Sequence, residues 1–363
     1  MSANRSLISP TSNSLLEQAL RDKLKRRSET TGKLGELEPL AIRVGLIQNT
    51  LKPRFDAPQL AVFAADHGLA VDGVCANTAS QPSTALLVQS LLTSQLPVSV
   101  FAGIHGMALN VVDCGVAEPV VAHPRLMARK IAHGTRNLRV TSAMSLEQAH
   151  AAIRAGMEIA DALPGNVIAC AGIGIGSHES AALVLSGLSG EPIRSLVVPG
   201  PPMSTDAESL LMMVMQTAQG RHGQLSDAVE VLAACGGFEM AMMVGVMLVA
   251  ASKRHLIMID GMPACAALMV ASRIAPTVTD YCVFCRSHGH PGLTQALSLF
   301  QAMALLELGM ESTDGTGATL AYPLLRSAAA LLTEVAEGED PGPSLPADIT
   351  AAGTGSTRPG PLA

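Results

Sequence analysis

Six short apolar runs, each followed by a stretch of helical character, constrain the fold of this chain more than any other feature. Each run ends in small or acidic residues, and the runs occupy 59–68, 107–117, 165–177, 193–202, 254–262 and 280–292. Continuous apolar strands that alternate with helices are typical of a parallel sheet buried on both faces. The sequence therefore predicts a doubly wound, Rossmann-like α/β core domain, which we place at residues 59–293.

The carboxyl ends of these strands are the expected place for a ligand, because loops converge there in an open parallel sheet. Several glycines and polar side chains occupy those ends: Asp66, His67, Gly174, Gly176, Ser177, Gly200, Asp260, Gly261 and His290. We interpret them as candidate substrate-binding residues.

Helical patterns flank the core on both sides. Residues 14–58 predict two helices joined by a glycine turn, and residues 294–337 return to helices. Segment 1–13 is polar, and we expect it to be a flexible tail. Segment 338–363 is rich in Pro, Gly and Ser, and we expect it to be disordered. Apolar residues make up 48% of the chain but aromatic residues only 2%, so the core must be filled by small aliphatic side chains, Met and glycine.

Charge and cysteine usage exclude several classes of function. The net charge is −6, and the densest basic run, "RDKLKRRS", alternates with acids and lacks nearby aromatic residues, so no nucleic-acid partner is expected. The seven cysteines lack paired metal spacing, and the single CxxC, Cys282 and Cys285, predicts reduced core thiols rather than a metal site. No metal or cofactor is therefore expected. The polar N-terminus has no secretory signal, which favours the cytoplasm. The apolar window 240–252 is shorter than the roughly 20 residues of a membrane span and predicts a buried helix.

Two motifs at the strand ends have a functional and a structural interpretation. "GIGIGSHES", residues 172–180, fits an anion site at a helix start, but it equally fits a close-packed glycine turn in which Ser177 caps the helix. Asp66 and His67 could orient a ligand or pair with one another; alternatively, they are a turn cap and a half-buried imidazole. His288 and His290 are too few for a metal site, so we interpret them as a lid or a substrate contact.

A third motif, Asp314-Gly315-Thr316-Gly317, lies between two segments that have helical patterns. A carboxylate followed by a hydroxyl between two glycines is either a helix cap or part of a catalytic site. The residues alone leave both interpretations open.

Taken in order, nine segments between about residue 30 and residue 335 resemble the nicotinate-nucleotide:dimethylbenzimidazole phosphoribosyltransferase family of cobalamin biosynthesis. They are "GKLGELEPLAIRVGLIQ", "VFAADHGLAVDGV", "VVDCGVA", "HGTRN" with "SAMSLEQA", "GIGIG", "VEVLAACGGFEMAMMVGVMLVAA", "DGMPACAALMVA", "DYCVF" with "HPG", and "LGMESTDGTGATLAYPLL". Each segment is unspecific, but the ordered series is hard to obtain by chance.

The resemblance implies a homodimeric enzyme in which helices from both chain ends, here 14–58 and 294–337, form a second, smaller domain. It implies that a ring nitrogen of dimethylbenzimidazole attacks C1′ of nicotinate mononucleotide, that nicotinate leaves, and that the configuration at C1′ inverts. The small-molecule substrates are then nicotinate mononucleotide and a benzimidazole base, and no cofactor is needed.

The resemblance also implies roles for individual residues. Asp314 stands where the family has its proposed general base, a group that typically contributes about 10²–10⁴ in rate. Gly315, Thr316 and Gly317 follow it in the substrate site, and Gln81 is a further substrate-binding residue.

Several positions depart from the family pattern, among them His290, which stands where the family has a Glu. Asp314 and Gly172 each replace a Glu, Pro201 and Pro202 interrupt the phosphate loop, and Met212 stands where the family has a Lys. Proline has no N–H to offer a phosphate. These departures motivate two alternative hypotheses. The first is a catalytically impaired paralogue that acts as a ligand-binding protein, or as a regulatory partner in a heterodimer with an active homologue. The second is a transferase that acts on an unphosphorylated nucleoside.

Overall fold

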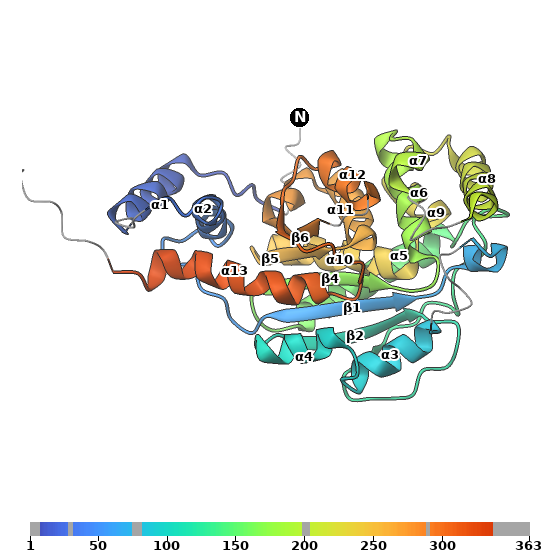
Figure 1. Ribbon diagram of the computed structural model, residues 1–363, viewed down its shortest axis with the longest axis horizontal. Coiled ribbons are helices and arrows are strands. Elements are labelled where there is room, and N and C mark those ends of the chain that lie inside the picture. The colour runs from blue at the N-terminus through green and yellow to red at the C-terminus, as the bar shows by residue number, and fades with distance from the viewer. Residues whose placement is uncertain (1–7, 28–31, 75–81, 198–203, 288–290, 337–363) are drawn as a thin grey trace, which may run out of the picture.

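The computed structural model describes residues 8–27, 32–74, 82–197, 204–287 and 291–336. Within these ranges seven parallel strands form one sheet in the order β3-β2-β1-β4-β5-β6-β7 (Figure 1). Their bounds are Gln59–Ala65 (β1), Ala108–Gly115 (β2), Leu126–Ala128 (β3), Val167–Ile173 (β4), Leu256–Asp260 (β5), Cys282–Ser287 (β6) and Ala304–Glu307 (β7). The chain winds outward from β1 to β3 and then returns to β4 beside β1, so the topological switch point lies between β1 and β4.

Helices cover both faces of this sheet, as the sequence predicted. One face carries α3 (Thr84–Leu92), α4 (Pro97–Ile104) and α13 (Thr316–Thr333). The other carries α5 (Leu146–Ala162), α10 (Phe238–Ser252), α11 (Met262–Ile274) and α12 (Pro291–Leu299). The remaining helices are α1 (Ser14–Arg27), α2 (Leu37–Ile47), α6 (Ser177–Ser189), α7 (Ile193–Leu196), α8 (Thr205–His222) and α9 (Ala228–Cys235), with short 3₁₀ turns at Gly68–Asp72 and Pro276–Tyr281.

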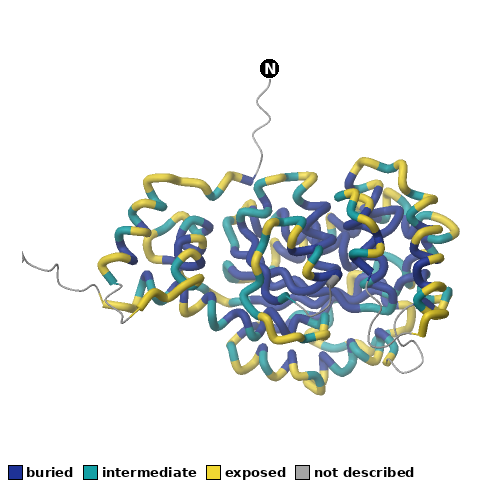
Figure 2. The backbone as a smooth tube through the Cα atoms, turned by 45° about the horizontal axis from the view of Figure 1, so that its top comes forward, coloured by how far each residue is buried: buried dark blue, intermediate teal, exposed yellow. Residues whose placement is uncertain are grey.

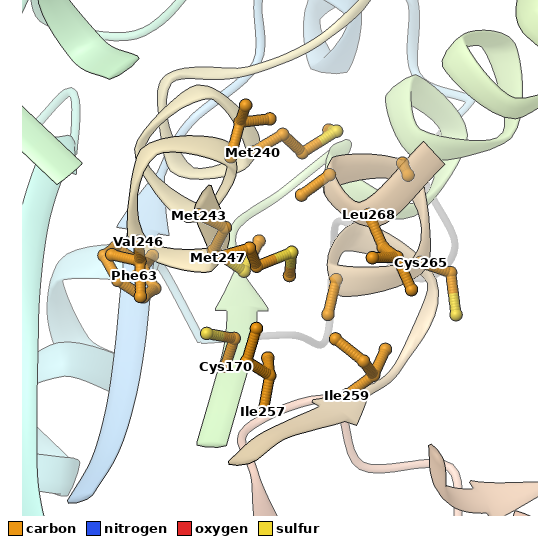
Figure 3. Packing of buried hydrophobic residues seen from close by; sticks show 14 of the residues in the cluster. Phe63, Cys170, Met240, Met243, Val246, Met247, Ile257, Ile259, Cys265 and Leu268 are labelled. Carbon is orange, nitrogen blue, oxygen red and sulfur yellow. The ribbon is translucent and has the colours of Figure 1, made fainter. Parts of the chain in front are cut away.

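The core lies between the sheet and the pair α10 and α11, where Met, Cys and aliphatic side chains from strands and helices interdigitate (Figure 3). Figure 2 shows the sheet and these helices as the most continuously buried part of the chain. Glycine permits the closest crossing: a methyl group at Gly156 of α5 would lie 1.9 Å from the Met242 carbonyl oxygen of α10. Small residues at such crossings explain how a chain with so few aromatic side chains fills its interior.

Three local predictions differ from the structure. The run 193–202 was expected to be a strand, but residues 193–196 form α7, because Ile193 and Leu196 are spaced to bury one face of a helical turn. The short edge strands β3 and β7 were not predicted. β7 lies in the segment expected to be wholly helical, since its sequence "ALLE" has no period-2 alternation to mark it as a strand. The assignment of 14–58 and 294–337 to one smaller domain stays a prediction, although α13 does pack against α1 and α2. The tail expected at 338–363 and residues 1–7 of the other tail lie outside the described residues.

Membrane-span criteria give one candidate among the described residues. The stretch Thr84–Ile104 is long and apolar enough by length and composition, and 33% of it is buried. It consists of two helices, since α3 ends at Leu92 and α4 begins at Pro97. The apolar window 240–252 lies in the buried helix α10, as predicted.

Candidate functional site

The end of β1 places Asp66 and His67 at the switch point, but they do not pair with each other. The Asp66 carboxylate accepts hydrogen bonds from the Thr84 hydroxyl at 2.5 Å and from the Ala117 N–H at 2.7 Å. The buried His67 ring instead forms a hydrogen bond from Nε2 to Oε1 of Glu239 at 2.9 Å. The prediction of a half-buried imidazole is therefore wrong: His67 is fully enclosed because α10 covers it.

The loop after β4 requires glycine for two separate reasons. A methyl group at Gly174, where φ is +155°, would lie 1.6 Å from the carbonyl oxygen of Ala65. Gly176 has φ +85° and is the N-cap of α6, so Ser177 is the first helical residue and not the cap. The Ser177 hydroxyl is free of the backbone and donates to Glu239 Oε1 at 2.8 Å. The predicted occupation of this hydroxyl by the helix end is thus wrong.

Glu239 is the residue at the switch point that the sequence reasoning missed. It is fully buried and receives both His67 and Ser177 on one carboxylate oxygen. Burial by itself lowers the pKa of His67, but the charge and hydrogen bond of Glu239, with the charges of Asp66 and Glu179, raise the pKa above its ordinary value. The available signal was an acid directly before the apolar window 240–252, since a buried carboxylate needs a partner.

The end of β5 places Asp260 in a second cluster. Its Oδ1 accepts a hydrogen bond from Nε of Arg286 on β6 at 2.6 Å, and its Oδ2 accepts the N–H of Ala318 on α13 at 2.9 Å. Arg286 also donates to the carbonyl oxygens of Met310, at 2.6 Å, and Ser312. The ion pair is buried, with side-chain exposures of 2% for Arg286 and 0% for Asp260. Both groups are therefore used to hold the segment 310–318 against the sheet.

Arg286 was also missed from the sequence. Its signal was a single cation directly after the apolar run "CVFC" of β6. Gly261, next to Asp260, has φ +87° and is the N-cap of α11, and a methyl group there would lie 3.5 Å from Arg286 Nη2.

The Asp314-Gly315-Thr316-Gly317 motif has features of both interpretations that the sequence left open. Asp314 Oδ1 accepts hydrogen bonds from the Thr316 N–H at 3.1 Å and from the Thr316 hydroxyl at 2.7 Å, so this oxygen caps the start of α13. The side chain is half-buried, and Oδ2 has no hydrogen bond to any described residue. Gly315 has φ +97° and packs on Leu60 and Ala171 of the sheet. One oxygen of Asp314 is thus structural and the other is free to act.

Three candidate residues, Gln81, Gly200 and His290, lie outside the described residues, and so do Pro201 and Pro202. Met212 is buried in α8, so the family's Lys position is an apolar core position in this chain. No group of three or more metal-ligating side chains occurs in the described part of the chain. What the site offers is a carboxylate oxygen of Asp314 without a hydrogen bond to any described residue, and two glycine turns at the starts of α6 and α13.

Comparison with known proteins gives one consistent result. A sequence model of the family described as Phosphoribosyltransferase matches residues 8–342. The nicotinate-nucleotide–dimethylbenzimidazole phosphoribosyltransferase of Cupriavidus necator is 42% identical over 328 residues, which cover 88% of this chain and 94% of that protein. The protein of the same name from Variovorax paradoxus is 39% identical over 329 residues, covering 91% and 94%.

Solved structures agree with these relatives. The crystal structure of CobT from Thermus thermophilus is 30% identical in sequence and superposes with a TM-score of 0.82. The match covers 88% of this chain and 96% of that one. The doubly wound sheet inferred from the sequence is therefore confirmed both by the structure and by this likeness.

Proposed function

The chain belongs to the nicotinate-nucleotide–dimethylbenzimidazole phosphoribosyltransferase family, and from this premise we propose that it transfers the phosphoribosyl group of nicotinate mononucleotide to dimethylbenzimidazole. The products are α-ribazole phosphate and nicotinate. The observation that carries the proposal is the free Oδ2 of Asp314, in a loop that Asp260 and Arg286 hold at the carboxyl edge of the sheet.

In the proposed reaction one ring nitrogen of the benzimidazole forms a bond to C1′ as the bond from C1′ to the pyridinium nitrogen breaks. Nicotinate leaves with that electron pair, which neutralises its ring nitrogen, and attack from the opposite side inverts C1′. The proton on the second benzimidazole nitrogen passes to Oδ2 of Asp314. Because Oδ1 is fixed by Thr316, the orientation of Oδ2 is set before substrate binds, as a general base requires.

The nucleotide is proposed to contact the two glycine turns. Gly174, Gly176 and Ser177 form the turn at the start of α6, where a helix terminus favours an anion, although the Ser177 N–H itself donates to the Gly174 carbonyl oxygen at 3.2 Å. Gly261 and Thr316 to Gly317 border the opposite side, and Asp66 and His67 shape the switch point. Gln81, Gly200 and His290 are proposed as further contacts on the strength of the resemblance alone.

Release of nicotinate from nicotinate mononucleotide plus dimethylbenzimidazole tests the proposal directly. An Asp314→Asn variant keeps an oxygen that caps α13 but cannot accept the proton, so we expect kcat to fall about 10²–10⁴-fold with little change in stability. An Asp314→Glu variant, which restores the longer acid of the family, is expected to retain activity. Absence of nicotinate release by the unmodified protein at high concentration would instead favour an impaired paralogue, and turnover of the nucleoside without phosphate would favour the second alternative.

We also propose that the protein acts as a homodimer in the cytoplasm. Apolar side chains of α3 and α4 remain exposed on the single chain, including Leu86 at 55% and Ile104 at 69%, and a second copy would cover them. Six described cysteines are free and buried, as in a reducing compartment. Light-scattering mass measurement tests the dimer, and subunit exchange with an active homologue tests a heterodimer.

A further inference from the structure

Glu239 is a buried acid that the proposed chemistry does not use. It is the second residue of α10, and its side chain is 0% exposed, as is that of His67. Its Oε1 receives both the His67 ring and the Ser177 hydroxyl. The carboxylate therefore joins three elements at the switch point: the end of β1, the start of α6 and the start of α10.

Two glycines make room for this carboxylate. A methyl group at Gly237 would lie 2.2 Å from Glu239 Oε2 and 2.4 Å from His67 Cε1. A methyl group at Gly172 would lie 3.4 Å from Glu239 Cγ. Gly172 is the position where an acidic group seemed to be lost, so a carboxylate is present beside that position, supplied by α10 rather than by β4.

The surroundings favour a charged pair. The groups that act on His67 are Glu239 from α10, Asp66 from the end of β1 and Glu179 from α6, and all three are acids. Cys114 of β2 also faces Glu239, and burial, followed by that charge, raises the pKa of its thiol, which keeps it neutral. An imidazolium is thus the only cation among the groups that act here, and removing one partner of a buried pair leaves an uncompensated charge.

Two atoms of the pair remain unsatisfied. His67 Nδ1 and Glu239 Oε2 are buried and have no hydrogen-bond partner in the part of the chain that the structure describes. Glu239 Oε2 and the His67 Cε1 atom, to which Nδ1 is bonded, both adjoin Gly237. Because unsatisfied buried polar groups are costly, a pair retained with two of them is better explained by a functional role than by stability.

The pair acts on the loop that is proposed to hold the nucleotide. Ser177 is the first residue of α6. The backbone N–H of His67 donates to the Ile175 carbonyl oxygen at 3.2 Å, and the backbone N–H of Ile175 donates to the Thr84 hydroxyl at 3.3 Å. The pair of His67 and Glu239 therefore fixes both the backbone of the 174–177 loop and the first side chain of α6.

We propose that Glu239 and His67 are positioning residues of the transfer reaction, which hold Ser177 and the 174–177 loop in the conformation that binds the nucleotide. The inference rests on the proposed function for the identity of that nucleotide. Neither residue touches the reacting atoms, so their loss acts mainly on nucleotide binding, while Asp314 acts on the chemical step.

The test compares Glu239→Gln with a control, Glu230→Gln, which changes an exposed first-turn glutamate of α9. Hydrogen bonds to charged groups are worth enough that we expect Glu239→Gln to raise KM for nicotinate mononucleotide about ten- to a hundredfold, with a smaller change in kcat. In the unmodified protein KM should rise as the pH passes the pKa of His67, and this inflection should vanish in Glu239→Gln. Glu230→Gln should change neither.

Ser177→Ala provides a second variant, which leaves the ion pair in place. It should raise KM in the same direction but retain the pH inflection. The proposal is overturned if folded Glu239→Gln has an unchanged KM and an unchanged pH profile. If Glu239→Gln does not fold, an unchanged KM in Ser177→Ala overturns it.

Calorimetric titration with nicotinate mononucleotide separates this inference from the proposed function. If the unmodified protein binds the nucleotide without turnover, the proposed reaction fails while weaker binding by Glu239→Gln still supports the positioning role. Equal binding by both proteins overturns it, and no binding by the unmodified protein overturns both.

Discussion

Replacing Gly317 by Ala tests whether the Asp260–Arg286 pair sets the position of the Asp314 loop. Gly317 is the second residue of α13, and its added methyl group would lie 2.5 Å from Arg286 Cδ and 2.9 Å from both carboxylate oxygens of Asp260. Carbon atoms in contact normally lie about 3.5–4.0 Å apart, so Arg286 must move by roughly 1 Å. Since Arg286 also donates to Met310 and Ser312, that movement reaches the loop.

Two effects of opposite sign decide the stability of this variant. Alanine in place of glycine favours a helix by up to about 1 kcal/mol. Overpacking a filled site costs about 1–3 kcal/mol. We therefore expect a net loss of about 1–2 kcal/mol in the free energy of unfolding. A displacement of the loop by about 1 Å should lower kcat/KM roughly a hundredfold.

The matched control is Gly220→Ala in α8, where a methyl group would meet no atom within 4 Å. Here only the helix preference acts, so we expect a gain of about 0.5–1 kcal/mol and unchanged activity. The two variants should therefore differ by about 1.5–3 kcal/mol, which for a chain of 363 residues corresponds to roughly 2–4 °C in the midpoint of thermal unfolding. If Gly317→Ala is as stable and as active as Gly220→Ala, the ion pair does not hold the loop and our reasoning about Asp260 is wrong.

Three further predictions concern other parts of the molecule. The pKa of His67 is raised on folding, so protonation of this ring stabilises the folded state fully below the unfolded pKa of 6.5, and this stabilisation is lost as the pH rises through the folded pKa. The free energy of unfolding, measured in denaturant at a series of pH values, should fall over that range, and His67→Gln should flatten this pH profile. Six described thiols are buried, with the pKa of Cys170 and of Cys265 raised to about 12, so a thiol reagent at pH 8 should modify at most one of the seven cysteines before unfolding, and none in Cys75→Ser. Gly174→Ala should lower the free energy of unfolding by about 3 kcal/mol or more, because its methyl group meets the Ala65 carbonyl. Gly190→Ala, which has a φ of +77° but open space around it, should lower it by only about 1–2 kcal/mol, and denaturant unfolding measures both.

The central strands and the buried helix α10 could be predicted because their apolar runs are long and uninterrupted. The strand predicted at 193–202 was wrong because Ile193 and Leu196 lie three residues apart, a helical spacing that is hard to recognise in so short a segment. β7 was missed because an edge strand of four residues takes its conformation from its neighbour rather than from its own sequence.

A similar physical reason separates the site residues that could be predicted from those that could not. Gly174, Asp260 and the Asp314 loop could be placed because strand ends converge and because the segments resemble a family in order. Glu239 and Arg286 could not, because each is a single charge inside an apolar segment whose partner is far away in sequence: Glu239 lies 172 residues from His67, and Arg286 lies 26 residues from Asp260. Their significance appears only when the fold brings the partners together.

Helix α13 begins with the Asp314 loop and ends against the N-terminal helices, about 27 Å away at 1.5 Å per residue. Along its length it packs against α2 (Figure 1). Near its far end the Arg27 side chain of α1 donates to the carbonyl oxygen of Leu331 at 3.0 Å. The helix is held at one end by a buried ion pair and at the other by the first helices of the chain. A protein that lacks the N-terminal helices should therefore hold the Asp314 loop less firmly, and lose activity, under conditions in which the sheet stays folded.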